Sequence, residues 1–112
     1  MDDLRLNKVS RLVQKELSEI FQRDGITSYN GNLISVTTVR MSSDLALAKV
    51  YLSIFTPKGR ENAFNIINEN KKAIRFQLGK KIKNQVKAIP ELAFFIDDSI
   101  EYANRIEELL KK

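Results

Sequence analysis

The segment LISVTTVRMSSDLALAKVYLSIF, residues 33–55, carries the clearest structural signal in the chain. Residues 33–41 are rich in β-branched side chains and alternate in polarity, which predicts a strand. Residues 46–55 form a mostly apolar run that predicts a second strand. Between them lies Ser42-Ser43-Asp44, a tight polar turn. We therefore expect an antiparallel hairpin in which Asp44 has a structural role, accepting backbone hydrogen bonds at the turn.

Lys49 interrupts the apolar run of the second predicted strand. Side chains alternate between the two faces of a strand, which places Lys49 on the second, mixed face, between Leu47 and Tyr51. The face expected to pack against helices consists of Ala46, Ala48, Val50, Leu52 and Ile54. Exposed Lys and Arg side chains commonly contact phosphates, and a phosphate contact is the interpretation favoured for Lys49.

Helical patterns flank this hairpin in the sequence. Residues 4–23 repeat apolar side chains at helical spacing, and we expect Gly25 to end that helix. Residues 92–96 predict a short third strand, and an apolar repeat from Ser99 onward predicts a terminal helix. Together with the helices between the second and third strands, the order is α-β-β-α-α-β-α, which indicates an α+β fold.

Residues 60–88 form the longest helical pattern. Its apolar stripe consists of Ala63, Phe64, Ile67, Ile74, Leu78, Ile82 and Val86. A straight helix of this length would span about 40 Å, nearly the diameter of a domain of this size. We therefore expect a bend, either at Asn70–Lys72 or at Gly79, and an end to the helix at Pro90.

Composition narrows the class of protein. The chain has 112 residues, a common size for one domain, and no cysteine. The lack of cysteine excludes disulfides and thiolate metal sites and fits a reducing compartment. No signal peptide or membrane-length apolar run is recognisable in the sequence. These features predict one soluble, cytoplasmic, monomeric domain over residues 1–112, with no membrane partner.

Catalysis has little support in the sequence, and we expect no enzyme activity. Without histidine or cysteine, the usual proton shuttle and thiol nucleophile are missing. The four glycines are scattered and form no phosphate loop, and we expect no cofactor and no small-molecule substrate. Asp97, Asp98 and Glu101 could hold a magnesium ion, as in a nuclease. The preferred interpretation is that Asp98-x-x-Glu101 is a capping box at the start of the terminal helix.

The positive charge is concentrated in one short segment. The net charge is +5, and residues 70–90 contain seven basic and no acidic residues. On the predicted helix, one face carries Lys72, Phe76, Lys80, Lys83 and Lys87, opposite the apolar stripe. Such a concentration of charge favours an anionic polymer as the partner.

Two interpretations of this basic face remain open. Lysine stripes are commonly just solvated outer surfaces, but this one lacks the acidic partners that usually stabilise an exposed helix. Phe76 lies among the lysines, where it could stack on RNA bases while the lysines contact phosphates. Alternatively, the bend in the helix rotates Phe76 into the core.

Three ordered motifs resemble the ribosome-binding factor A family over about residues 5–110. The first is the opening helix RLNKVSRLVQKELSEIF, and the second is VTTVRMSSDLALAKVYLSIF, which is similar to the family's S-x-D-L-x-x-A-K-V-Y core. The third is AIRFQLGKKI followed by IPELAFFIDDSIEYANRIEELL, similar to the family's I-R-x-x-L-G and P-E-L-x-F-x-x-D-x-S.

The resemblance implies a KH-like fold of type II order, with a three-stranded sheet and its helices on one face. In the family, an Ala-x-Gly bend between two helices replaces the RNA-gripping KH loop, and here Asn70-Lys71-Lys72 occupies that place. The implied function is non-catalytic binding of the free 30S ribosomal subunit and its 16S rRNA late in maturation. The family supports folding and processing of the 5′ region of that rRNA, especially in the cold.

The residues expected to contact RNA are the cations of residues 70–90, Phe76 and a few others. They are Lys71, Lys72, Arg75, Phe76, Lys80, Lys81, Lys83 and Lys87, with Lys49 and, on the first helix, Arg5, Lys8 and Arg11. The alternative is a protein-binding adaptor domain that makes no direct contact with RNA.

Overall fold

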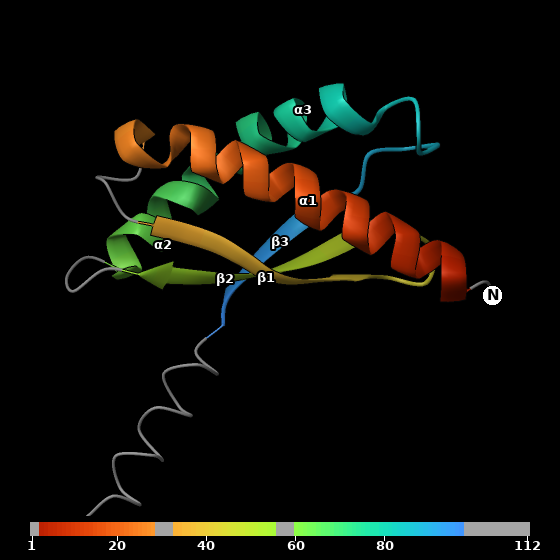
Figure 1. Cartoon of the computed structure of the whole chain (residues 1–112), viewed down its shortest axis with the longest axis horizontal. Helices are drawn as coiled ribbons and strands as arrows, with labels where there is room; N and C mark the ends of the chain where they lie inside the picture. Colours follow the sequence, from red (N-terminus) through yellow and green to blue (C-terminus); the bar gives the residue numbers. More distant parts are fainter. Residues whose placement is uncertain (1–2, 29–32, 56–59, 98–112) are drawn as a thin grey trace, which may run out of the picture.

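The computed structural model describes residues 3–28, 33–55 and 60–97, which form three helices and three strands in the order α1-β1-β2-α2-α3-β3 (Figure 1). The elements are α1 (Asp3–Ser28), β1 (Leu33–Met41), β2 (Leu47–Phe55), α2 (Arg60–Glu69), α3 (Lys71–Ile82) and β3 (Glu91–Ile96). This order confirms the predicted α+β fold. The predicted terminal helix lies outside the described residues.

The three strands form one mixed sheet with β2 in the centre. β1 pairs with β2 in antiparallel orientation, as the hairpin prediction required, and Arg40 lies opposite Lys49. β3 pairs with β2 in parallel orientation, and Tyr51 lies opposite Phe95. A parallel neighbour needs a crossover connection, which α2 and α3 supply. The pairing of β1 with β2 shifts near Thr37, an irregularity that the sequence did not predict.

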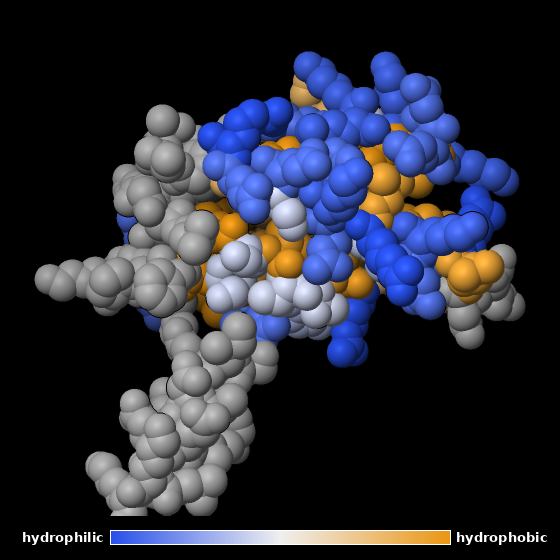
Figure 2. All heavy atoms as spheres, viewed as in Figure 1, coloured by the Kyte–Doolittle hydropathy of each residue, from blue (hydrophilic) through white to orange (hydrophobic). Residues whose placement is uncertain are grey.

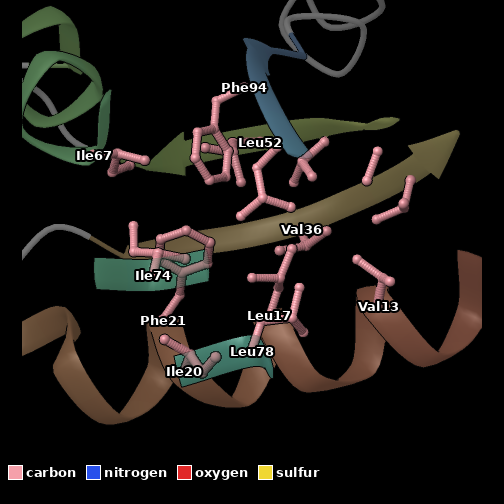
Figure 3. Close-up of a cluster of buried hydrophobic side chains, with 14 of the residues drawn as sticks. Val13, Leu17, Ile20, Phe21, Val36, Leu52, Ile67, Ile74, Leu78 and Phe94 are labelled. Carbon is pink, nitrogen blue, oxygen red and sulfur yellow. The ribbon is translucent and has the colours of Figure 1, made fainter. Parts of the chain in front are cut away.

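The helices lie on one face of the sheet, and the core fills the space between them (Figures 1 and 3). Leu17 of α1, Leu52 of β2 and Leu78 of α3 are fully buried there, and Phe21 and Phe94 meet edge to face with ring centroids 6.1 Å apart. Each such side chain contributes about 1.5–3 kcal/mol through burial. The buried face of β2 consists of Ala48, Val50, Leu52 and Ile54, as predicted. The prediction was wrong for Ala46, which is exposed and precedes the strand.

The first helix is longer than the sequence indicated. Gly25 does not end it, because α1 continues to Ser28. Glycine costs only about 1 kcal/mol inside a helix, so the glycine signal alone does not force an end.

The long helical pattern breaks at Asn70, the first of the two predicted hinges. The Asn70 backbone N–H donates to the carbonyls of Ile66 and Ile67, and its side-chain amide also donates to the Ile66 oxygen at 3.0 Å. The side chain thus adds a second hydrogen bond to the Ile66 carbonyl, which already accepts the Asn70 backbone N–H at the end of α2. No Ala-x-Gly is needed for this bend.

The prediction that the second half of this helix continues to Ala88 was wrong, because α3 ends at Ile82. Beyond it, Val86 and Ile89 pack against the core, which draws the chain away from the helix axis toward β3. The residue before a proline is also disfavoured in a helix, and Ile89 precedes Pro90.

Candidate nucleic-acid interface

A stripe of side chains runs along the solvent side of α3 and the turn that follows it. We call Lys72, Phe76, Lys80, Lys83 and Lys87 the lysine stripe, and all five residues are exposed. On the opposite side of α3, Ile74, Leu78 and Ile82 are buried. Lys83 still has helical backbone angles, and its N–H donates to the Gly79 carbonyl. Lys87 lies beyond the helix, so the stripe ends in a non-helical segment.

Phe76 is on the surface rather than in the core. Its exposed fraction is 65%, and the ammonium group of Lys80 lies 4.7 Å from the centre of its ring. The bend at Asn70 does not rotate this ring inward. The stripe therefore presents an exposed aromatic ring, with Lys72 before it and Lys80 after it along α3.

Two of the predicted cations make contacts within the fold. Arg75 donates from Nε to the Pro90 carbonyl at 3.0 Å and from Nη2 to the Ile89 carbonyl at 2.8 Å. The same Nη2 lies 3.6 Å from a carboxylate oxygen of Glu91. Arg75 thus fixes the chain as it enters β3.

Lys81 connects the two long helices of the helix layer. Its ammonium group lies 3.5 Å from carboxylate oxygens of both Glu16 and Glu19 on α1. Farther along α1, Arg23 donates to the side-chain oxygen of Gln77 at 3.0 Å. Because later residues of α1 meet earlier residues of α3, the two helices run antiparallel.

Lys71, at the start of α3, is half-buried.

The predicted cations of α1 are all exposed. Arg5, Lys8 and Arg11 lie on its surface in the N-terminal half, and Arg5 lines the same groove as Lys87 at the end of the lysine stripe. Lys15 is also exposed on α1, and the sequence reasoning missed it. The helical spacing of residues 8, 11 and 15 could have revealed it.

Lys49 is exposed on the face of the sheet away from the helices, so it does not share a surface with the stripe. The same face carries Arg40, Tyr51 and Phe95, which the sequence reasoning did not select. Tyr51 and Phe95 stack with centroids 5.3 Å apart, and the Arg40 guanidinium lies 5.9 Å from the Tyr51 ring centre. Their positions at alternate residues of the strands are the sequence signal for this face.

Asp44 has the structural role that was predicted for it. Its Oδ1 accepts hydrogen bonds from the Ser42 hydroxyl at 2.7 Å and from the Ala46 N–H at 3.0 Å. These two bonds, led by the one from Ser42, hold the pKa of Asp44 below its ordinary value. The turn places Leu45 at a φ of 62°, in the left-handed region that a bulky side chain rarely adopts.

Of the carboxylates considered for magnesium, only Asp97 lies in the described part of the chain. It accepts a hydrogen bond from the Thr37 hydroxyl at 2.7 Å. Within residues 3–28, 33–55 and 60–97, no three acidic side chains come together in a way that could hold a metal ion. None of the helices described there is long and apolar enough to cross a membrane.

The fold and the lysine stripe define a small, basic, KH-like domain with exposed lysines along one helix. The family model described as Ribosome-binding factor A matches residues 5–110, and the chain belongs to that family. A ribosome-binding factor A from Cytophaga hutchinsonii is 39% identical over 112 residues, which is 100% of this chain and 84% of that protein.

Two structures of relatives share the fold. The crystal structure of ribosome-binding factor A from Thermus thermophilus matches with a TM-score of 0.68 and 20% identity, covering 81% of this chain and 94% of the other. A homology model of the Thermus thermophilus factor, fitted into the cryo-EM map of a 30S complex, matches with a TM-score of 0.63 and 21% identity. That comparison covers 78% of this chain and 89% of the other. The family is named for ribosome binding and not for a reaction.

Proposed function

We propose that this protein is a non-catalytic assembly factor that binds the free 30S ribosomal subunit and contacts its 16S rRNA late in maturation. The lysine stripe is the observation that carries the proposal, because it combines four lysines with an exposed aromatic ring and no acidic residue between positions 70 and 90. Membership of the ribosome-binding factor A family supports the choice of partner. We further propose that binding supports folding and processing of the 5′ end of 16S rRNA.

The stripe suits RNA in a way that an ordinary solvated surface does not. Lysines neutralise phosphates and release counterions, which gives affinity without sequence preference. Phe76 offers a ring face on which an unpaired base can stack. Lys72, Lys80, Lys83 and Lys87 are the primary contacts, with Arg5, Lys8 and Arg11 secondary. Arg75 and Lys81 act mainly within the fold.

A protein of this kind acts through binding energy alone. It favours one rRNA conformation only as far as it binds that conformation more tightly than the others. The proposal therefore includes no cofactor and no chemical step, and it treats the chain as one monomeric domain working in the cytoplasm.

Sedimentation tests this proposal directly. The purified protein is mixed with free small subunits, or with intact ribosomes, across a salt series and then centrifuged. We expect binding to free small subunits that weakens as salt rises, and much weaker binding to intact ribosomes. Binding that is indifferent to salt would support the protein-binding adaptor instead, and no binding at low salt would overturn the proposal.

A further inference from the structure

A groove of about 620 Å³ opens where the N-terminal part of α1, the β1–β2 turn and the segment after α3 come together. Its apolar lining consists of Leu6, Val9, Leu45, Val86, Ile89 and Pro90. In Figure 2, hydrophobic surface is visible between hydrophilic rims at this end of the molecule. The groove lies at the opposite end of α3 from the bend at Asn70. Its volume falls within the range of small-molecule pockets, about 300–1,000 Å³.

The charged groups of the groove favour an anion at its rim. Arg5 on α1 and Lys87 in the segment after α3 are exposed cations that line the groove. The lining also contains the cation Arg75 and the two acids Asp44 and Glu91, so three positive charges stand against two negative ones. Glu91 lies 3.6 Å from Arg75, which offsets its charge, whereas Asp44 accepts hydrogen bonds from neutral groups and stays ionised. The small excess of positive charge comes from Arg5 and Lys87, so we expect an anionic group to bind beside these two side chains.

The walls are held in place by hydrogen bonds. The β1–β2 turn is closed by bonds from the Ser42 N–H to the Leu47 carbonyl and from the Leu45 N–H to the Ser42 carbonyl, both at 2.9 Å. These bonds keep Leu45 in its left-handed conformation. On the other wall, Arg75 fixes the carbonyls of Ile89 and Pro90. Backbone strain that the surroundings maintain is frequent at ligand-binding sites.

We propose that this groove receives a single unpaired nucleotide of RNA, with its base against the apolar walls and its phosphate between Arg5 and Lys87. The inference rests on the proposed function, because Lys87 belongs both to the groove and to the lysine stripe. One RNA molecule can then place the phosphates of a base-paired stem along the lysine stripe and a single unpaired base in the groove. Proteins read RNA mainly at such unpaired positions in bulges, loops and ends.

A pair of RNA hairpins tests the groove separately from the stripe. One hairpin is fully paired, and the other has the same stem with a single-nucleotide bulge. We expect the protein to bind the bulged hairpin about tenfold more tightly, which corresponds to about 1.4 kcal/mol. Equal binding to the two hairpins, or binding to neither, overturns the groove proposal.

Ala46→Trp fills the groove with little risk to the fold. Ala46 is exposed and lines the groove, and its backbone bonds to Asp44 and Glu91 do not involve the side chain. We expect the variant to lose the preference for the bulge while keeping its affinity for the paired hairpin. Asn65→Trp, at an exposed position on α2 outside the groove, is the control and should keep the preference. Ala88→Trp repeats the test from the opposite wall if Ala46→Trp unfolds.

A bulge preference that survives in the filled variants contradicts the proposal. Failure of the groove is distinguishable from failure of the proposed function. A protein that still sediments with free small subunits in a salt-dependent way, but does not distinguish the two hairpins, retains the proposed function and lacks the nucleotide site.

Discussion

The ammonium group of Lys80 lies over the ring of Phe76 at 4.7 Å from its centre, one helical turn away on the solvent side of α3. A cation at this distance is attracted to the ring face by about 0.5–1 kcal/mol at an exposed site. The contact places an aromatic surface and a positive charge in the same small area. A nucleotide offers both a planar base, which can stack on an aromatic ring, and a phosphate, which attracts a cation, and this pair is therefore the centre of the proposed interface.

Replacing Phe76 with Ala should weaken RNA binding and leave the fold intact. A stacked base contributes roughly 1–3 kcal/mol, so we expect a loss of affinity of about tenfold in a binding titration. Because the ring is 65% exposed, the free energy of unfolding should change by less than about 0.5 kcal/mol. Phe94→Ala is the control, since that ring is only 6% exposed and its loss should cost about 3–5 kcal/mol of stability. A large stability loss in Phe76→Ala would contradict its placement on the surface.

Lys80 and Lys81 are neighbours in sequence that should behave differently. Lys80→Ala removes an exposed cation of the stripe. The slope of log affinity against log salt concentration should therefore become shallower, by about 0.9 if Lys80 contacts a duplex phosphate and by about 0.7 if it contacts a single strand. Lys81→Ala should leave that slope unchanged, because Glu16 and Glu19 already neutralise this lysine. It should instead cost up to about 1 kcal/mol of stability, as is usual for surface ion pairs. Equal slopes in the two variants would contradict the assignment of Lys80 to RNA binding and of Lys81 to the contact between α1 and α3.

The features that were predicted correctly from the sequence are those that neighbouring residues determine. The alternation in residues 33–55 correctly placed Val50 and Leu52 in the core and Lys49 on the open face, because the period of two along a strand leaves no other choice. Helix length predicted a bend but left its position open between Asn70–Lys72 and Gly79, and the structure has it at Asn70. In each case the determining residues lie close together in the chain.

The features that the sequence missed depend on contacts between distant segments. The end of α3 at Ile82 follows from the packing of Val86 and Ile89 on the core, whereas the local pattern continued the helix. Arg75 looked like a free cation until its carbonyl partners, 14 and 15 residues away, were known. The groove could not be predicted for the same reason, since three separate segments form it.

Asn70→Ala should destabilise the bend between α2 and α3. The substitution removes the side-chain bond to the Ile66 carbonyl, and a bond of this kind contributes about 1 kcal/mol. We expect the urea midpoint to fall by a corresponding amount with an unchanged m-value. Asn65→Ala, at an exposed position in the middle of α2, should have no such effect. A variant as stable as the wild type would show that the backbone alone maintains the break.

Asp44→Ala should destabilise the protein in a way that depends on pH. The bonds from Ser42 and Ala46 favour the ionised carboxylate, so the pKa of Asp44 in the folded protein lies below the ordinary value of 3.8. The unfolded chain then binds the proton more readily, and the contribution of Asp44 to stability is complete above the ordinary pKa. It is lost as the pH falls through the folded pKa. The difference in urea midpoint between wild type and Asp44→Ala should therefore be largest at neutral pH and shrink in acid.

This difference isolates Asp44 from the other carboxylates that titrate in the same range, because they are present in both proteins. Glu69→Ala removes an exposed negative charge from α2 without altering the turn, and it controls for the change in net charge. A difference between wild type and Asp44→Ala that stays constant from neutral pH into acid would show that packing around Leu45 holds the turn. In that case, the hydrogen bonds to Asp44 would follow from the left-handed backbone and would not be its cause.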